Sequence, residues 1–299
     1  MPSAPKKVWI PAAWLMLGVA AIGMAPIFVR WSTVGPVSTA FWRLILAWSV
    51  LKFRPSRPAW TQDDRNWRKP ALIAGLAFGA DLGVWHISVR ETSVANATLL
   101  ANLAPIFMLL IAQIFLDEPI RKRVWFAIAL SFSGVLLLLG GGVSLHGSRG
   151  DAFGFLTAIF YSIYLLALRR IPRSVSSMRV LSFTSFTGAM VVLPFALVLE
   201  PKVVPHTLVG VLVLVGLAGV SQILGQGLIT RYLAEVPASL SSAILVCQSA
   251  FAAFFGWCFL GESLGVWQGI GALLMLLGVF WVRLLAIVPR LQVSPKGKK

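Results

Sequence analysis

The chain has 299 residues, of which 58% are hydrophobic and 12% are charged, and its mean hydropathy is +0.85. A soluble domain carries about 25% charged residues, so this composition excludes a soluble globular protein and predicts an integral membrane protein. The net charge of +16 would suit nucleic-acid binding, but the distribution of the positive residues argues against it. Cys247 and Cys258 both lie in apolar stretches and indicate no disulfide framework.

Ten apolar stretches follow one another along the chain. The hydrocarbon core of a bilayer is about 30 Å thick, and a helix needs about 20 residues to cross it. Helices satisfy their own backbone polar groups within lipid. The sequence therefore predicts an all-α integral membrane protein with ten transmembrane helices, near residues 9–29, 36–54, 70–89, 94–116, 122–142, 152–170, 179–199, 207–230, 237–260 and 265–286.

Positive residues alternate between dense and sparse connecting segments. With a cytoplasmic N-terminus, 21 of the 26 Lys and Arg residues fall in cytoplasmic segments, four fall outside, and Arg43 lies within the second span. Positive residues concentrate on the cytoplasmic side of membrane proteins, so both termini are predicted to be cytoplasmic. The net charge is then a topology signal beside anionic lipid headgroups, and we expect no nucleic-acid partner.

Two similar hexamers, FLDEPI at 115–120 and FLGESL at 259–264, stand 144 residues apart. At the same offset, further residues match in corresponding helices, namely Gly75 with Gly219, Gly83 with Gly227, Glu91 with Glu235, Phe107 with Phe251, Glu118 with Glu262 and Gly134 with Gly278. This pattern predicts an internal duplication. The first repeat covers residues 9–142, the second covers 150–286, and a basic cytoplasmic tail covers 287–299.

Each repeat holds an odd number of predicted helices, so the two repeats cross the membrane in opposite directions. Glu91 falls outside and its counterpart Glu235 inside, while Glu118 falls inside and Glu262 outside. Inverted repeats are typical of secondary carriers, which bind solute near the bilayer midplane between two halves. The sequence therefore predicts a carrier that works by alternating access.

The paired five-helix repeats, the AFWR motif at 40–43, the two hexamer turns and the final Gly-Val helix resemble the drug/metabolite transporter superfamily, and within it the EamA branch. The resemblance covers about residues 12–140 and 152–285. It implies the ten-helix fold and a transport function. Within the branch, the aromatic and uncharged polar interior is most similar to the aromatic amino acid exporters. The shared motifs shape packing and turns, so they specify the fold more than the solute.

Charged side chains deep in a membrane protein are functional candidates. Asp81 is the only acidic residue placed deep in a predicted span, and Arg43 is the only deep basic one. The two form a structural ion pair or contact the solute, and the sequence leaves both interpretations open. His86 lies one helical turn from Asp81, on the face of three glycines that predict close helix packing, Gly75, Gly79 and Gly83. It is either a packed, hydrogen-bonded residue or a solute ligand.

Uncharged polar and aromatic side chains complete the candidate binding site, namely Trp85, Asn102, Tyr161, Tyr164, Gln222, Gln226 and Gln248. An amide offers both donors and acceptors, so several amides could hold the ammonium and carboxylate of a zwitterion. The structural alternative is that the amides bridge helices and that the aromatic rings are core. In the binding interpretation, the mid-span tyrosines border a water-filled cavity, since each buried hydroxyl needs a partner. Their rings would then stack on an aromatic or apolar solute.

Three prolines interrupt predicted spans, Pro26, Pro105 and Pro194. Each breaks a helical hydrogen bond, and the result is either a hinge that lines a cavity or a harmless kink. The first predicted span has no Asp or Glu, which disfavours the proton antiport of small multidrug exporters in the same superfamily. No GxxxxGKS or GxxxxGKT motif and no metal-site spacing occurs, so we expect no cofactor and no metal.

These patterns favour a secondary exporter of amino acids, aromatic or bulky apolar ones preferred, that works by facilitated uniport. We expect it in a bacterial inner membrane as a monomer, with a dimer as the alternative. The competing hypothesis within transport is a different solute, such as a cationic drug, a nucleobase or a sugar derivative, with possible proton coupling. An intramembrane enzyme is the hypothesis from another class, but its clustered metal-binding acids are missing.

Overall fold

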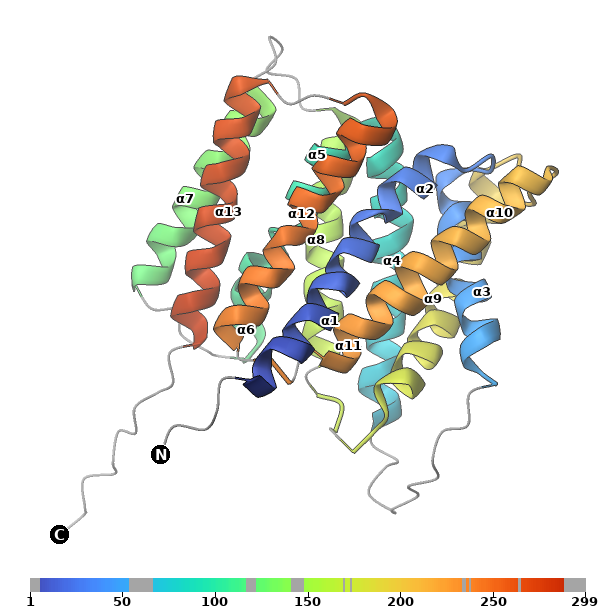
Figure 1. Cartoon of the computed structure of the whole chain (residues 1–299), viewed down its shortest axis with the longest axis horizontal. Helices are drawn as coiled ribbons and strands as arrows, with labels where there is room; N and C mark the ends of the chain where they lie inside the picture. Colours follow the sequence, from blue (N-terminus) through green and yellow to red (C-terminus); the bar gives the residue numbers. More distant parts are fainter. Residues whose placement is uncertain are drawn as a thin grey trace.

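In the computed structural model, residues 6–53, 67–116, 122–140, 148–168, 170–172, 174–232, 235–236, 238–262 and 265–287 are described. All regular secondary structure in these ranges is helical (Figure 1). The predicted all-α class is therefore confirmed. Most of the FLDEPI turn and all but the first residue of the predicted basic tail lie outside the described residues.

The first half of the sequence forms seven helical segments, α1 (Lys6–Gly23), α2 (Ala25–Trp31), α3 (Pro36–Leu51), α4 (Arg68–Glu91), α5 (Val94–Ala101), α6 (Ala104–Leu116) and α7 (Lys122–Gly140). The second half forms α8 (Arg149–Leu168), α9 (Ser177–Leu199), α10 (Leu208–Gly216), the π-helix η2 (Leu217–Gln226), α11 (Gly227–Tyr232), α12 (Ala238–Leu260) and α13 (Val266–Ile287). Each predicted apolar stretch is helical over most of its described residues. Three of them are divided, at Met24, at Asn102–Leu103, and by the π-helix.

Five described segments are long and apolar enough to cross a membrane, namely Trp9–Trp31, Arg68–Glu91, Arg149–Leu168, Ser177–Leu199 and Leu208–Tyr232. Shorter apolar helices include Pro36–Leu51 and Cys247–Leu260. Large apolar side chains are exposed along the outside, such as Val198, Leu208 and Val266, as expected for a surface in lipid. The arrangement of ten spans remains a prediction.

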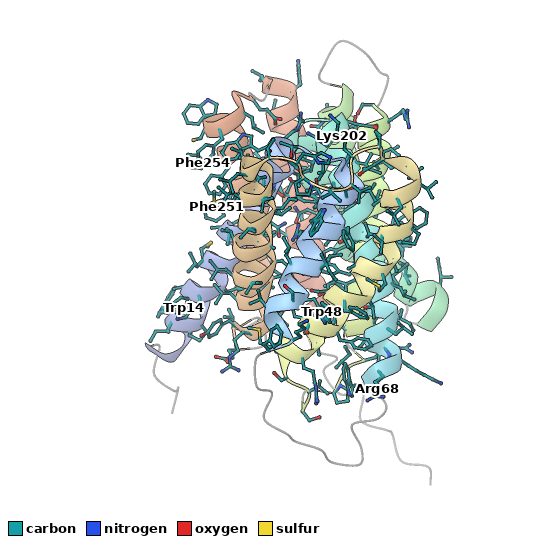
Figure 2. The ribbon with its side chains drawn as sticks, turned by 90° about the vertical axis from the view of Figure 1, so that its right-hand side faces the viewer. Trp14, Trp48, Arg68, Lys202, Phe251 and Phe254 are labelled. Carbon is teal, nitrogen blue, oxygen red and sulfur yellow. The ribbon has the colours of Figure 1, made fainter. Side chains whose placement is uncertain are left out.

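Helices from the two halves of the sequence lie side by side. Helix α4 packs against α8 and α9, α3 against α9, and α1 against α12 and η2. A Cβ added to Gly79 would lie 2.5 Å from the Gly188 carbonyl oxygen, so only glycine allows the α4 and α9 backbones this close approach. The start of α1 and the end of α13 lie at the same end of the bundle (Figure 1). Arg68 and Lys202 mark its opposite ends (Figure 2).

The contact between α7 and α13 is symmetric under an exchange of residues 144 apart. A Cβ added to Gly134 would lie 2.6 Å from the carbonyl oxygen of Gly271, and one added to Gly278 would lie 2.7 Å from that of Ala127. Gly278 follows Gly134 by 144 residues, and Gly271 follows Ala127 by 144. Each helix therefore presents the same residue positions to the other, as an isologous two-fold contact does.

Candidate functional site

A polar connection across three helices begins at Arg43, in the second turn of α3. Its side chain is only 3% exposed, and its Nε donates to Oε1 of Gln222 on η2 at 3.0 Å. The Gln222 amide nitrogen in turn donates to the Ser185 hydroxyl on α9 at 3.3 Å. The amide orientation is thereby defined at both ends, and Gln222, fully buried, fixes the position of the guanidinium. Sequence reasoning did not include Ser185 in the site.

Asp81 on α4 is the second buried charge of the site, at 5% exposure. Its carboxylate and the Arg43 guanidinium interact electrostatically, but no direct ion pair joins them in the part of the chain that the structure describes. The direct partner of Arg43 is Gln222 instead. A buried acidic group and a buried basic group that do not contact each other directly are costly unless other polar groups stabilise them.

Aromatic rings of α8 and α4 stack next to these charges. Tyr164 is 2% exposed, and its ring stacks on Phe78 at 4.7 Å and on Tyr161 at 5.7 Å between centroids. The Tyr164 hydroxyl shares a hydrogen bond with the Gln226 side chain. Half-buried Tyr161 interacts electrostatically with Arg43. The structure therefore brings together Arg43, Asp81, Tyr161, Tyr164, Gln222 and Gln226, and we call these six residues the central cluster.

The two glutamines of the central cluster come from the π-helix η2. A π-helix closes i→i+5 hydrogen bonds and is rare, and it occurs mainly at functional sites. Ser221 of the same segment donates to the Ala21 carbonyl oxygen of α1 at 3.3 Å, so η2 is held from two sides. The sequence predicted a regular helix here and gave no sign of the wider turn.

Trp85 and His86 lie further along α4, toward the end at which α3 begins. The His86 ring is fully buried and its Nδ1 lies 3.2 Å from the Pro36 carbonyl oxygen. Its Nε2 is buried without a hydrogen-bond partner among the described residues. Trp85 is buried with its ring 5.4 Å from that of His86. His86 interacts electrostatically with Arg43 of the central cluster, and a role in solute binding stays a prediction for both residues.

Asn102 follows α5 and contacts α12, and Gln248 lies on α12. The Asn102 amide nitrogen donates to the Thr98 carbonyl oxygen at 2.8 Å and to the Ser249 hydroxyl. This amide therefore bridges helices, as the structural alternative proposed. Gln248 is half-buried on α12. Their predicted contact with solute is not tested by these bonds.

The three prolines stand in different local settings. Helix α2 begins at Ala25, next to Pro26, and α6 begins at Ala104, next to Pro105. Both are first-turn positions, where proline costs no hydrogen bond. Pro194 lies inside the continuous helix α9. Whether any of the three acts as a hinge stays a prediction.

Comparison with known proteins identifies the family. The model of the EamA-like transporter family matches residues 9–140 and again residues 148–284. The chain belongs to the EamA-like transporter family. A solved crystal structure has the same fold, with a TM-score of 0.59, at 16% identity over 93% of this chain and 96% of its own.

Relatives in this family carry transporter names. The pseudopaline exporter CntI of Pseudomonas aeruginosa is 25% identical over 64% of this chain and 66% of its own length, so the match spans just under two thirds of that protein. An uncharacterized transporter of Helicobacter pylori is 23% identical over 93% of this chain and 96% of its own. A riboflavin transporter of Rhizobium johnstonii is 24% identical over 45% of this chain and 46% of its own length. These names point to a transporter rather than an enzyme, and they differ in solute.

Proposed function

We propose that this protein is a secondary transporter that exports amino acids, with aromatic or bulky apolar ones preferred, by alternating access. The observation that carries the proposal is the arrangement of Arg43 and Asp81. Both are almost completely buried, one is basic and the other acidic, and among the described residues no direct ion pair joins them. A free amino acid offers a carboxylate and an ammonium group a short distance apart, so it can satisfy both charges at once.

The other members of the central cluster suit the same solute. The carboxylate would meet the terminal nitrogens of Arg43, whose Nε already donates to Gln222. The ammonium would meet Asp81, and a large apolar side chain would lie against the stacked rings of Tyr161, Tyr164 and Phe78. Aromatic rings favour such contacts. Because Arg43 and Asp81 come from the same chain, a monomer suffices.

The carrier mechanism rests on two halves of opposite orientation. The two-fold contact between α7 and α13 and the two matches of the family model support this arrangement. Inverted halves can rock about a central site and expose it to each side in turn. The charge distribution favours cytoplasmic termini in a bacterial inner membrane. Since Trp9–Trp31 contains no acidic residue, we propose gradient-driven uniport.

A different solute is the second candidate function. The relatives include a pseudopaline exporter and a riboflavin transporter, which differ in solute, so family membership leaves the solute open. A cationic drug would need Asp81 alone, whereas an amino acid needs both charges. Proton coupling through the Asp81 carboxylate belongs to this second candidate.

The test is solute uptake into proteoliposomes that contain the purified protein, screened against the twenty amino acids with and without a proton gradient. The proposal expects saturable uptake of phenylalanine and other large apolar amino acids, unchanged by the gradient. Asp81→Asn should abolish that uptake, while Glu235→Gln, which changes an exposed glutamate at a helix end, should not. Full phenylalanine transport by Asp81→Asn would refute the carboxylate as the anchor. No uptake of any amino acid by the native protein would refute the proposed solute.

A further inference from the structure

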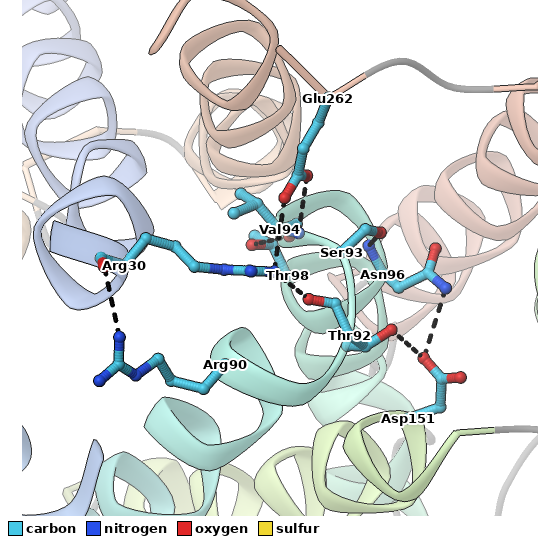
Figure 3. A network of polar contacts seen from close by, with 9 residues as sticks. All are labelled: Arg30, Arg90, Thr92, Ser93, Val94, Asn96, Thr98, Asp151 and Glu262. Carbon is cyan, nitrogen blue, oxygen red and sulfur yellow. Dashed lines mark hydrogen bonds and ion pairs between the residues drawn. The ribbon is translucent and has the colours of Figure 1, made fainter. Parts of the chain in front are cut away.

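Three carboxylates of the second half hold the first half at one end of the bundle. Asp151 stands in the first turn of α8, Glu200 follows α9, and Glu262 follows α12. Each accepts hydrogen bonds from residues between Val37 and Asn96 of the first half. We call these three residues the clasp. Two of them and their partners are drawn in Figure 3.

Glu262 connects two segments of the first half. Its Oε2 accepts from the backbone N–H of Val94, the first residue of α5, at 2.9 Å. Its Oε1 lies 3.5 Å from a terminal nitrogen of Arg30 in α2 (Figure 3). That same Arg30 nitrogen donates to the Thr92 carbonyl oxygen. A carboxylate at a helix N-terminus satisfies an amide that has no partner within the helix, and it also opposes the positive end of the helix dipole.

Asp151 holds the same region from α8. Its Oδ1 accepts from the Thr92 hydroxyl at 2.8 Å and from the Asn96 amide at 3.3 Å (Figure 3). Its Oδ2 accepts from the backbone and hydroxyl of Ser148. Asp151 is 6% exposed, so these bonds are shielded from water and individually stronger than surface ones.

Glu200 holds the start of α3. Its two carboxylate oxygens accept from the backbone N–H groups of Val37 and Ser38 at 2.7 and 2.8 Å. Next to it, the Trp42 indole donates to the Val203 carbonyl oxygen at 2.7 Å. A Cβ added to Gly35 would collide with the Glu200 carboxylate, so the glycine leaves the space that this cap occupies.

The fourth acidic residue of the second half behaves differently. Glu235, near the end of α11, pairs with Arg231 four residues earlier at 3.7 Å, and both side chains are largely exposed. This pair lies within one half, and among the described residues no bond joins it to the other half. Exposed ion pairs of this kind contribute little to the stability of a protein. Among the described residues, the carboxylates that join the halves are therefore gathered at one end.

We infer that the clasp is the outer gate of the carrier, closed in this structure. Two halves that rock about a central site must separate at one end while they meet at the other. Separation at the clasp end would free the N–H groups of Val37, Ser38 and Val94, which only water could then satisfy. Opening and hydration of the outer end are therefore one event. The inference rests on the proposed carrier mechanism but not on the identity of the solute.

A labelling experiment tests this inference without measuring transport. Thr98 is 1% exposed and lies one turn beyond Val94 in α5. A single cysteine at this position, Thr98→Cys, is placed in the full chain with Cys247→Ala and Cys258→Ala. A membrane-impermeant maleimide is added outside intact cells, and the labelling rate is measured with the clasp native or altered. Glu235→Gln serves as the matched control.

The inference expects Glu262→Ala to raise the labelling rate about tenfold, the factor for loss of one hydrogen bond to a charged group. Glu262→Gln, which keeps an acceptor for Val94 but loses the charge, should raise it less, and Glu235→Gln should not change it. Asp151→Asn should also raise the rate, which keeps the test available if Glu262→Ala does not fold. Native-like labelling in folded Glu262 and Asp151 variants, or an equal rise in Glu235→Gln, would overturn the inference. A protein that passes this test yet transports no amino acid would contradict the proposed solute alone.

Discussion

Arg43 of α3 donates from Nε to Oε1 of Gln222 in the π-helix, at 3.0 Å, although the two residues are 179 positions apart in the sequence. This bond orients the guanidinium while Asp81 stays without a direct ion-pair partner among the described residues. Gln222 therefore acts as a positioning residue. We propose that it keeps Arg43 and Asp81 available to a solute instead of to each other.

Replacing Gln222 tests this role. In Gln222→Leu the guanidinium loses its orienting acceptor and can turn toward Asp81, so the solute must compete with an internal ion pair. We expect the KM for phenylalanine to rise about tenfold, the effect of one hydrogen bond to a charged group, with a smaller change in maximal rate. Glu235→Gln is the control, because Glu235 is exposed and lies outside the central cluster. An unchanged KM in Gln222→Leu would contradict the positioning role.

Tyr164 is expected to set the preference for aromatic side chains. Tyr164→Ala removes the ring that stacks between Phe78 and Tyr161. Such contacts are worth about 0.5–1.5 kcal/mol each, so the ratio of phenylalanine to leucine transport should fall by up to about tenfold. Trp14→Ala, which removes a ring stacked on Tyr232 elsewhere in the bundle, should leave the ratio unchanged. A constant ratio in Tyr164→Ala would mean that this ring does not contact the solute.

The α7–α13 contact makes a prediction about stability. In Gly278→Ala the new methyl group would lie 2.7 Å from the Ala127 carbonyl oxygen and force the helices apart. Overpacking of this kind costs about 1–3 kcal/mol, so the Tm of the purified protein should fall. Gly269→Ala, on the same helix, meets no atom within 4 Å and should be neutral or slightly stabilising. Equal Tm values for the two variants would contradict the close approach.

The proposed inverted repeat predicts an opposite effect for the counterpart of Glu262. Glu118, 144 residues earlier, lies outside the described residues, and its prediction rests on the sequence offset. If Glu118 holds the inner end closed as Glu262 holds the outer end closed, Glu118→Gln should favour the state that is open to the inside. Labelling of Thr98→Cys from outside should then be slower. The assay is the one used for the clasp. Faster labelling in Glu118→Gln would argue against functional inversion of the two repeats.

The helical class and the positions of the helices followed from the sequence, because apolar runs of bilayer length leave the backbone few alternatives. Pro26 and Pro105 also stand next to helix starts, where proline fits. Glycine spacing on α4 predicted its close packing, and Gly79 does meet Gly188. These features depend on local pattern, which a single sequence displays directly.

Other features depend on distant residues. The π-helix has no side-chain pattern of its own, so the regular helix expected for Gln222 was wrong in its local geometry. The bonds from Glu200 to α3 and from Glu262 to α5 join residues more than 160 positions apart. Nothing local distinguishes such a helix cap from a carboxylate exposed in a loop. The prediction for Arg43 and Asp81 was also incomplete. The sequence could not place Gln222 beside Arg43, or Ser185 beside Gln222.

The most direct measurement is competition against phenylalanine uptake by analogues that each lack one charge. Phenylethylamine has no carboxylate for Arg43, and 3-phenylpropanoate has no ammonium for Asp81. Leaving one buried charge unpaired costs about 2–5 kcal/mol, so each analogue should need at least about thirty times the concentration of phenylalanine to compete. Competition by either analogue as effective as that of phenylalanine would contradict a site built around both charges.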